Sequence, residues 1–201
     1  MKQPTQRDLQ AKHRRNQLLD IALGLFAERG LENVSIKDIA AEADIASGLI
    51  YHYFRSKDDL LAAVFQRYNP LPDFEAIAQE LTDLPVREGL LLFAQRLAKL
   101  LPEKRRVIRL LVREMLSPRS TMLAQVAELR QHGIALFSDY MQRRIATGEL
   151  RPHQPLVPLH MLVSSSLILL LLDQPIEPFV APFVDTLLDG ISSDKQEPGG
   201  Y

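Results

Sequence analysis

The sequence predicts an all-α protein with a small N-terminal helical domain and a larger C-terminal one. Apolar residues recur at helical spacing along almost the whole chain, and no segment shows the alternation between turn residues that is typical of strands. Prolines and isolated glycines fall between the periodic segments, where they end helices. Of the 201 residues, 46% are hydrophobic and 24% are charged, which is ordinary for a globular protein with a buried core.

The first periodic segment runs from residue 18 to Gly30, which is expected to end the helix. Its inner stripe consists of Leu18, Ile21, Ala22, Leu25 and Phe26. This helix is expected to pack against the two short helices that follow it.

Two short helical patterns, separated by a three-residue break, lie between Ser35 and Lys57. Ser35 is a natural N-cap for the first pattern. The inward face of that pattern is formed by Ile36, Ile39, Ala40 and Ala43. The second pattern has an inner face of Ile50, Tyr53 and Phe54 and an outer face of Ser47, Gly48, Tyr51 and His52. A short second helix that presents small, polar and aromatic residues is typical of a helix that reads the major groove of DNA.

The run from Gly48 to Phe54, followed by Ser56, Lys57 and Leu60, resembles the tetracycline-repressor (TetR/AcrR) family of bacterial regulators. The resemblance covers residues 11–68 and implies a three-helix helix-turn-helix domain there. It further implies that the rest of the chain dimerises and binds a small molecule, which changes the separation of the two recognition helices.

Three residues depart from the family pattern. Asp44 stands at a usual turn glycine, but aspartate tolerates left-handed backbone, so the turn is still expected. Ala46 stands where a serine usually caps the recognition helix, which leaves Ser47 as the nearest substitute. Leu49 replaces a common threonine and can contact a thymine methyl group, so we expect a different operator sequence.

The residues expected to contact DNA lie on the two short helices and at the start of the next one. They are Ser35, Lys37, Ser47, Gly48, Leu49, Tyr51, His52, Tyr53 and Lys57. Leu49 and His52 are expected to read base edges, whereas Tyr51 and Lys57 are expected to contact phosphates.

Net charge is −1, so the chain is no general polyanion binder and charge must be read locally. Among the first fifteen residues only Asp8 is acidic. Five are basic, namely Lys2, Arg7, Lys12, Arg14 and Arg15. We interpret residues 1–10 as a flexible basic arm, which either reaches phosphates or a minor groove or is a solvated tail.

Beyond Tyr68, prolines mark a domain boundary, and a helical domain is expected over residues 69–192, with a disordered tail at 193–201. Its helices are expected at 73–82, 86–101, 103–116, 121–147, 156–172 and 178–191. The last two are too apolar for a surface and are expected to form a four-helix bundle with a second subunit, unless they are buried within a monomer. The expected interface consists of Leu162, Leu169, Phe179, Val180, Phe183, Val184, Leu187 and Leu188.

A cavity for a hydrophobic or amphipathic ligand is expected between the helices of this domain. Its candidate walls are Phe93, Leu97, Leu100, Ile108, Val112, Met115, Phe137, Tyr140, Met141, Ser164, Ser165 and Leu167. Two alternatives stay open. Each of these residues can be plain core, and the serine run can serve close helix packing. A row of arginines at 105, 106, 109 and 113 is read as a solvated or ion-paired face.

Nothing in the sequence indicates enzymatic chemistry, a cofactor or a metal. The five histidines are scattered, the glycines form no phosphate loop, and there is no cysteine to form a disulfide or a thiolate site. No signal peptide or membrane span is evident, so a reducing cytoplasm is expected.

These features predict a homodimeric transcriptional regulator, a repressor that binds an inverted repeat in duplex DNA and is released by a small ligand. Two alternatives remain. One is an architectural or division-control protein on the same fold that binds a protein partner, and the other is a helical enzyme or carrier, for which a buried acid/base pair would be required.

Overall fold

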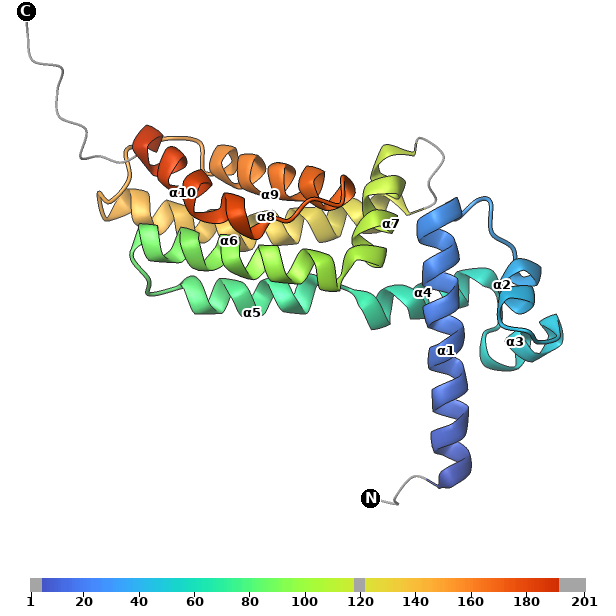
Figure 1. The fold of residues 1–201 in the computed structure, drawn as a ribbon. Coiled ribbons are helices and arrows are strands. Elements are labelled where there is room, and N and C mark those ends of the chain that lie inside the picture. Colours follow the sequence, from blue (N-terminus) through green and yellow to red (C-terminus); the bar gives the residue numbers. More distant parts are fainter. Residues whose placement is uncertain (1–4, 118–121, 192–201) are drawn as a thin grey trace, which may run out of the picture. The chain divides into compact units, whose positions relative to one another are not determined.

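The computed structural model describes residues 5–117 and 122–191, and every regular element within them is a helix, which confirms the predicted fold class (Figure 1). The chain packs as two compact units. The N-terminal unit runs to Asn69 and also includes Arg106–Val126, while the C-terminal unit contains Pro70–Arg105 and continues from Ala127. Residues 106–117 and 122–126, which were expected in the C-terminal domain, therefore pack with the N-terminal helices.

The N-terminal unit contains α1 (Gln6–Arg29), α2 (Ile36–Glu42), α3 (Ser47–Tyr53), α4 (Lys57–Tyr68) and most of α7 (Arg105–Leu116). Its core is built from side chains that are fully buried, among them Leu18, Phe26, Ile39, Ile50 and Leu60. The predicted inner stripe of α1 is confirmed, except that Ile21 is only half-buried.

α1 begins well before its apolar stripe. A capping box fixes its start, because the Thr5 hydroxyl accepts from the Asp8 amide while the Asp8 carboxylate accepts from the Thr5 amide. Residues 6–10, expected to be a flexible arm, are therefore helical. Residues 1–4, like the expected tail at 193–201, lie outside the described residues.

The C-terminal unit is built around α6 (Val86–Glu103), on which α5 (Leu71–Leu81), α9 (Leu156–Leu171) and α10 (Glu177–Ile191) pack. The long α8 (Leu123–Ala146) completes it (Figure 1). These bounds differ by a few residues from the predicted ones. No helix among the described residues is both long and apolar enough to cross a bilayer.

Tyr140 holds the start of α6 against α8. Its hydroxyl lies 3.2 Å from the Leu84 carbonyl oxygen and 3.1 Å from that of Pro85, so it donates to this turn. Burial raises the pKa of Tyr140 to about 12. A glycine is needed opposite, because a Cβ at Gly89 would overlap the phenol ring and its hydroxyl.

The same turn is held by Arg144 and Glu149. The Arg144 guanidinium donates to the Thr82 carbonyl and to the Glu149 carboxylate, each at 2.9 Å. The other Glu149 oxygen accepts from the Val86 amide, also at 2.9 Å, and the bond from Arg144 holds the pKa of Glu149 below its usual range. The α5–α6 turn is thereby fixed to the end of α8.

Candidate nucleic-acid interface

The first helix of the helix-turn-helix is fixed at its start by Ser35. Its hydroxyl donates to the Asp38 carboxylate (2.6 Å) and accepts from the Asp38 amide (3.2 Å), while its own amide donates back to the carboxylate (2.7 Å). The bonds from the Ser35 hydroxyl and amide lower the pKa of Asp38. The predicted N-cap is confirmed.

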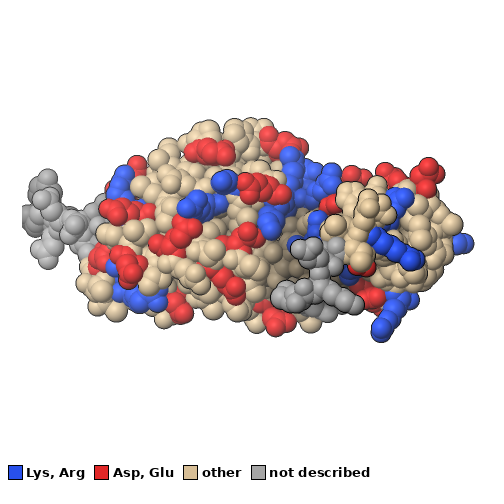
Figure 2. All heavy atoms as spheres, turned by 90° about the horizontal axis from the view of Figure 1, so that it is seen from below, with Lys and Arg blue, Asp and Glu red and all other residues tan. Residues whose placement is uncertain are grey.

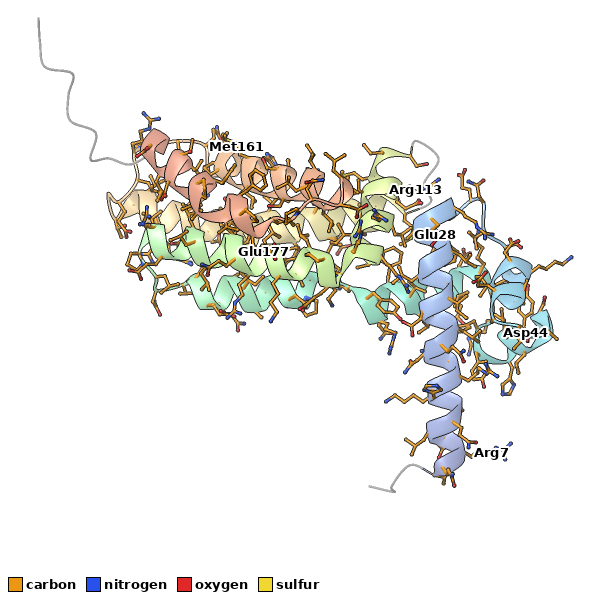
Figure 3. All side chains as sticks on the ribbon, in the orientation of Figure 1. Arg7, Glu28, Asp44, Arg113, Met161 and Glu177 are labelled. Atoms are coloured by element: carbon orange, nitrogen blue, oxygen red, sulfur yellow. The ribbon has the colours of Figure 1, made fainter. Side chains whose placement is uncertain are left out.

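The turn between α2 and α3 passes through Asp44, which has a φ of 51°. This left-handed conformation is one that aspartate tolerates better than most residues. The amide of Ile45 donates across the turn to the Ala40 carbonyl at 3.0 Å. The expected turn therefore forms without a glycine, and Figure 3 shows Asp44 at this corner.

α3 begins without a side-chain cap. Ala46 occupies the N-cap position and makes no such bond, and Ser47 is already the first helical residue. The expectation that Ser47 would substitute as the cap is wrong, because its backbone is helical, whereas an N-cap is non-helical. Two buried side chains, Ile50 and Phe54, hold the inner side of α3 in the core.

The outer side of α3 is open to a partner. Leu49 is 38% exposed and Tyr51 is 56% exposed, and Gly48 and His52 are exposed as well. Tyr53 is half-buried and meets the His52 ring edge to face, with ring centroids 5.3 Å apart. The helix therefore presents small, apolar and aromatic groups outward, as a groove-reading helix requires.

The flanking polar residues are already engaged. The Lys57 ammonium donates to the carbonyl oxygen of Leu31, and the Ser35 hydroxyl is shared with Asp38. Lys37, by contrast, is exposed on α2. Ser35 or Lys57 could bind a phosphate only by giving up its present hydrogen-bond partner. Lys37 and the outer residues of α3 are therefore the better candidates for contact with DNA.

Two residues of α7, Arg113 and Glu114, support this domain through contacts that the sequence did not reveal. Arg113 donates to the Glu28 carbonyl at 2.8 Å and so satisfies an acceptor at the end of α1 (Figure 3). Glu114 is only 3% exposed, and its carboxylate lies 3.5 Å from the Leu31 amide nitrogen. The peptide groups of Leu31 thus lie between Glu114 on one side and Lys57 on the other. No local sequence signal could reveal this, because the contacts link distant segments.

The candidate ligand residues do not form one cluster. Phe93, Leu97, Leu100, Phe137, Tyr140 and Met141 are buried in the C-terminal unit. The rings of Phe93 and Phe137 are 4.6 Å apart. Ile108, Val112 and Met115 instead belong to the N-terminal unit, and Met115 is 46% exposed.

The serine run lies mainly on the outside of α9. Ser164 and Ser165 are exposed and Leu167 is half-buried, whereas Ser166 is buried. Consecutive residues on a helix point about 100° apart, so three in a row cannot all face the core. Ser164 and Ser165 therefore line no internal cavity of the isolated subunit.

Half of the expected interface residues are buried within one subunit. Leu162, Val180, Val184 and Leu187 are at most 8% exposed in the isolated chain, because they lie on the sides of α9 and α10 that pack inward. They have almost no surface to offer a partner, so assigning them to a dimer interface was wrong. Leu169, Phe183 and Leu188 are half-buried, and Phe179 is 53% exposed.

A different apolar surface is exposed on α9. We call it the α9 outer face, and it consists of Val157, Met161, Ser164, Ser165, Ile168, Leu171 and Leu172. These residues recur at helical spacing on one side, and Ile168 is 56% exposed. Met161 lies on this side of the helix in Figure 3.

Comparison with known proteins agrees with this reading of the N-terminal domain. Residues 18–64 match the model of bacterial regulatory proteins of the tetR family. A transcriptional repressor from Mycobacterium tuberculosis, KstR2, is 40% identical over 75 residues, a match that covers 33% of this chain and 38% of that protein. The chain's sequence match therefore spans well under half the length of that relative.

Solved structures resemble the chain over most of its length. The ketosteroid regulator KstR2 of M. tuberculosis has a TM-score of 0.71 at 21% identity, over 90% of this chain and 96% of that one. FadR of Bacillus subtilis, solved with stearoyl-CoA, has a TM-score of 0.66 at 18% identity, over 87% and 97%. At such identities, the likeness establishes a shared fold.

Proposed function

We propose, from the premise that residues 18–64 are the DNA-binding domain of a tetR-family bacterial regulator, that this protein is a homodimeric transcriptional repressor. The observation that carries the proposal is α3, whose inner side is locked by Ile50 and Phe54 while Leu49, Tyr51 and His52 stand outward. Such a helix inserts into the major groove and reads base edges from its outer side.

We propose that the dimer forms through the α9 outer face together with Phe179 and Phe183 of α10. An apolar surface of this extent on one side of a helix marks an interface, and the small Ser164 and Ser165 allow a partner helix to approach closely. A symmetric dimer carries two equivalent recognition helices. It therefore binds an inverted repeat whose half-site centres lie roughly 34–36 Å apart or at a multiple of that spacing. Selection of duplexes from a random-sequence pool tests this.

Replacing Leu49 by alanine is expected to relax the base preference at one position of each half-site. The leucine can contact a thymine methyl group. A wrong base pair at a recognised position typically costs about 1–3 kcal/mol, and this discrimination is expected to fall without the leucine. Tyr51→Ala is the matched comparison, because a lost phosphate contact weakens binding to all sequences alike. Competition between single-base variants of the operator measures both. Equal weakening of specific and nonspecific binding by Leu49→Ala would contradict this division of roles.

We further propose that a hydrophobic or amphipathic small molecule releases the DNA by binding the C-terminal unit. The support is the buried apolar cluster of Phe93, Leu97, Phe137 and Met141. KstR2 is described as a ketosteroid regulator, and the FadR structure holds stearoyl-CoA. A steroid nucleus and a stearoyl chain are both apolar, which agrees with the side chains of this cluster.

Linkage makes the ligand proposal testable without knowing the natural ligand. A compound that binds the free protein more tightly than its DNA complex must lower operator affinity by the same factor. We expect steroids or long-chain acyl compounds that raise the melting temperature to weaken operator binding. Compounds that stabilise the protein but leave operator affinity unchanged would count against release by ligand.

A further inference from the structure

α1 extends about two turns beyond the part of the helix that is packed. Residues 6–13 are exposed, and burial begins only at Leu18. The capping box of Thr5 and Asp8 nevertheless fixes the helix at Gln6. Short helical turns with no buried face are only marginally stable in water. The capping box at Thr5 and Asp8 therefore supplies local stabilisation that this segment needs to stay helical.

The first part of α1 is basic: Arg7 and Lys12 are exposed, and Arg14 and Arg15 are partly exposed. Between Thr5 and Leu19 the cations are Arg7, Lys12, Arg14 and Arg15, and the one acid is Asp8. The Asp8 carboxylate accepts from the Thr5 amide at 3.0 Å and from the Thr5 hydroxyl at 2.6 Å, so it forms part of the capping box. Figure 2 views the molecule from this end and shows lysine and arginine side chains exposed there. The segment therefore suits an anionic partner.

Arg15 places this segment beside the recognition helix. Its guanidinium carbon lies 5.0 Å from the centroid of the Phe54 ring, and Phe54 directly follows α3. At 1.5 Å per residue, Arg7 lies roughly 12 Å farther along α1 than Arg15. Figure 3 shows Arg7 near the free end of the helix. The cations of α1 therefore begin next to the end of α3 and continue toward the start of α1, so on bound DNA they would lie near the backbone that borders the groove.

We infer that residues 6–16 form a helical basic extension that binds the backbone phosphates flanking each half-site. The inference rests on the proposed function and adds a contact outside the family match, which begins at residue 18. Its place next to α3 favours DNA over an acidic protein or an anionic membrane. Because phosphate contacts carry no sequence information, the extension raises affinity and widens the footprint without altering base preference.

The test replaces Arg7, Lys12 and Arg14 by glutamine, which has a similar helix propensity. Arg15 stays, because it contacts Phe54. A matched control makes the same charge change at three exposed residues of the C-terminal unit, with Lys99→Gln, Arg130→Gln and Arg151→Gln. A third variant, Arg7→Lys, Lys12→Arg and Arg14→Lys, keeps the charge. Binding to a long random-sequence duplex and to a selected operator is measured against salt, with circular dichroism to compare helix content.

We expect the glutamine variant to lose roughly ten-fold or more in affinity for both duplexes at low salt, with its salt slope reduced by up to about 0.9 for each lost contact. The charge-retaining variant and the control should match the parent. A glutamine variant that binds like the control overturns the inference, whatever else the segment binds. If the unmodified protein bound no DNA, the proposed function itself would be wrong. Failure of the proposed function is thus distinguishable from failure of the inference about residues 6–16.

Discussion

Replacing both Met161 and Ile168 by aspartate is expected to convert the proposed dimer into monomers that bind the operator at least roughly 100-fold more weakly. Both side chains are about half exposed in the single subunit, at 50% and 56%, so the subunit can fold with aspartate there. In a dimer each carboxylate would be buried without a partner. Its cost is on the order of 3 kcal/mol or more, and symmetry doubles it.

Sedimentation measures the mass in solution, and titration of operator DNA measures the affinity. The matched control is the pair Met115→Asp and Leu116→Asp, which adds the same charge at exposed apolar residues of α7. The control should remain dimeric. If the Met161 and Ile168 double variant is folded and still dimeric, the interface lies elsewhere than the α9 outer face.

Replacing Gly30 by alanine is expected to lower the free energy of unfolding of the N-terminal unit by about 1–3 kcal/mol. Gly30 has φ 84° and ψ 156°, a region that is essentially restricted to glycine. An added Cβ would also lie 2.8 Å from the Nε atom of Arg113. Both effects act where α7 supports the end of α1, so the amides of α1 and α2 should exchange with solvent faster than in the parent protein.

Gly24→Ala is the matched control, because Gly24 lies inside α1 and an added Cβ would meet no atom within 4 Å. It should raise stability by roughly 0.5–1 kcal/mol, as alanine does inside a helix. Thermal unfolding gives the stabilities, and hydrogen exchange of peptides from α1 and α2 locates the change. Adding Arg113→Ala separates crowding from backbone strain. A Gly30→Ala protein as stable as the parent would refute the strain argument.

The sequence predicted α2, the turn at Asp44 and the inner side of α3 because these depend on residues close together in the chain. The cap at Ser35 and the buried Ile50 follow from local spacing. The early start of α1 was missed because residues 6–16 carry almost no apolar period. The Thr5 and Asp8 pair, three residues apart, is the one signal that could have revealed it.

Other features could not be predicted because they depend on where distant helices pack. α9 is apolar on nearly every side, so its sequence could not show that Leu162 faces inward while Ile168 faces outward. Likewise, the arginine row suggested a solvated or ion-paired face, and Arg105 does pair with Asp173, but Arg113 satisfies a carbonyl at the end of α1. The engagement of Lys57 by Leu31 also requires the three-dimensional fold.

Selection of duplex DNA from a random-sequence pool by this protein tests the central claim most directly. The account predicts that the recovered sequences share an inverted repeat, with half-site centres roughly 34–36 Å apart or at a multiple of that spacing. It also predicts that Leu49→Ala, carried through the same selection, loses preference at one symmetric pair of positions and keeps the others. Recovery of asymmetric or unrelated sequences, with no enrichment over successive rounds, would contradict the account.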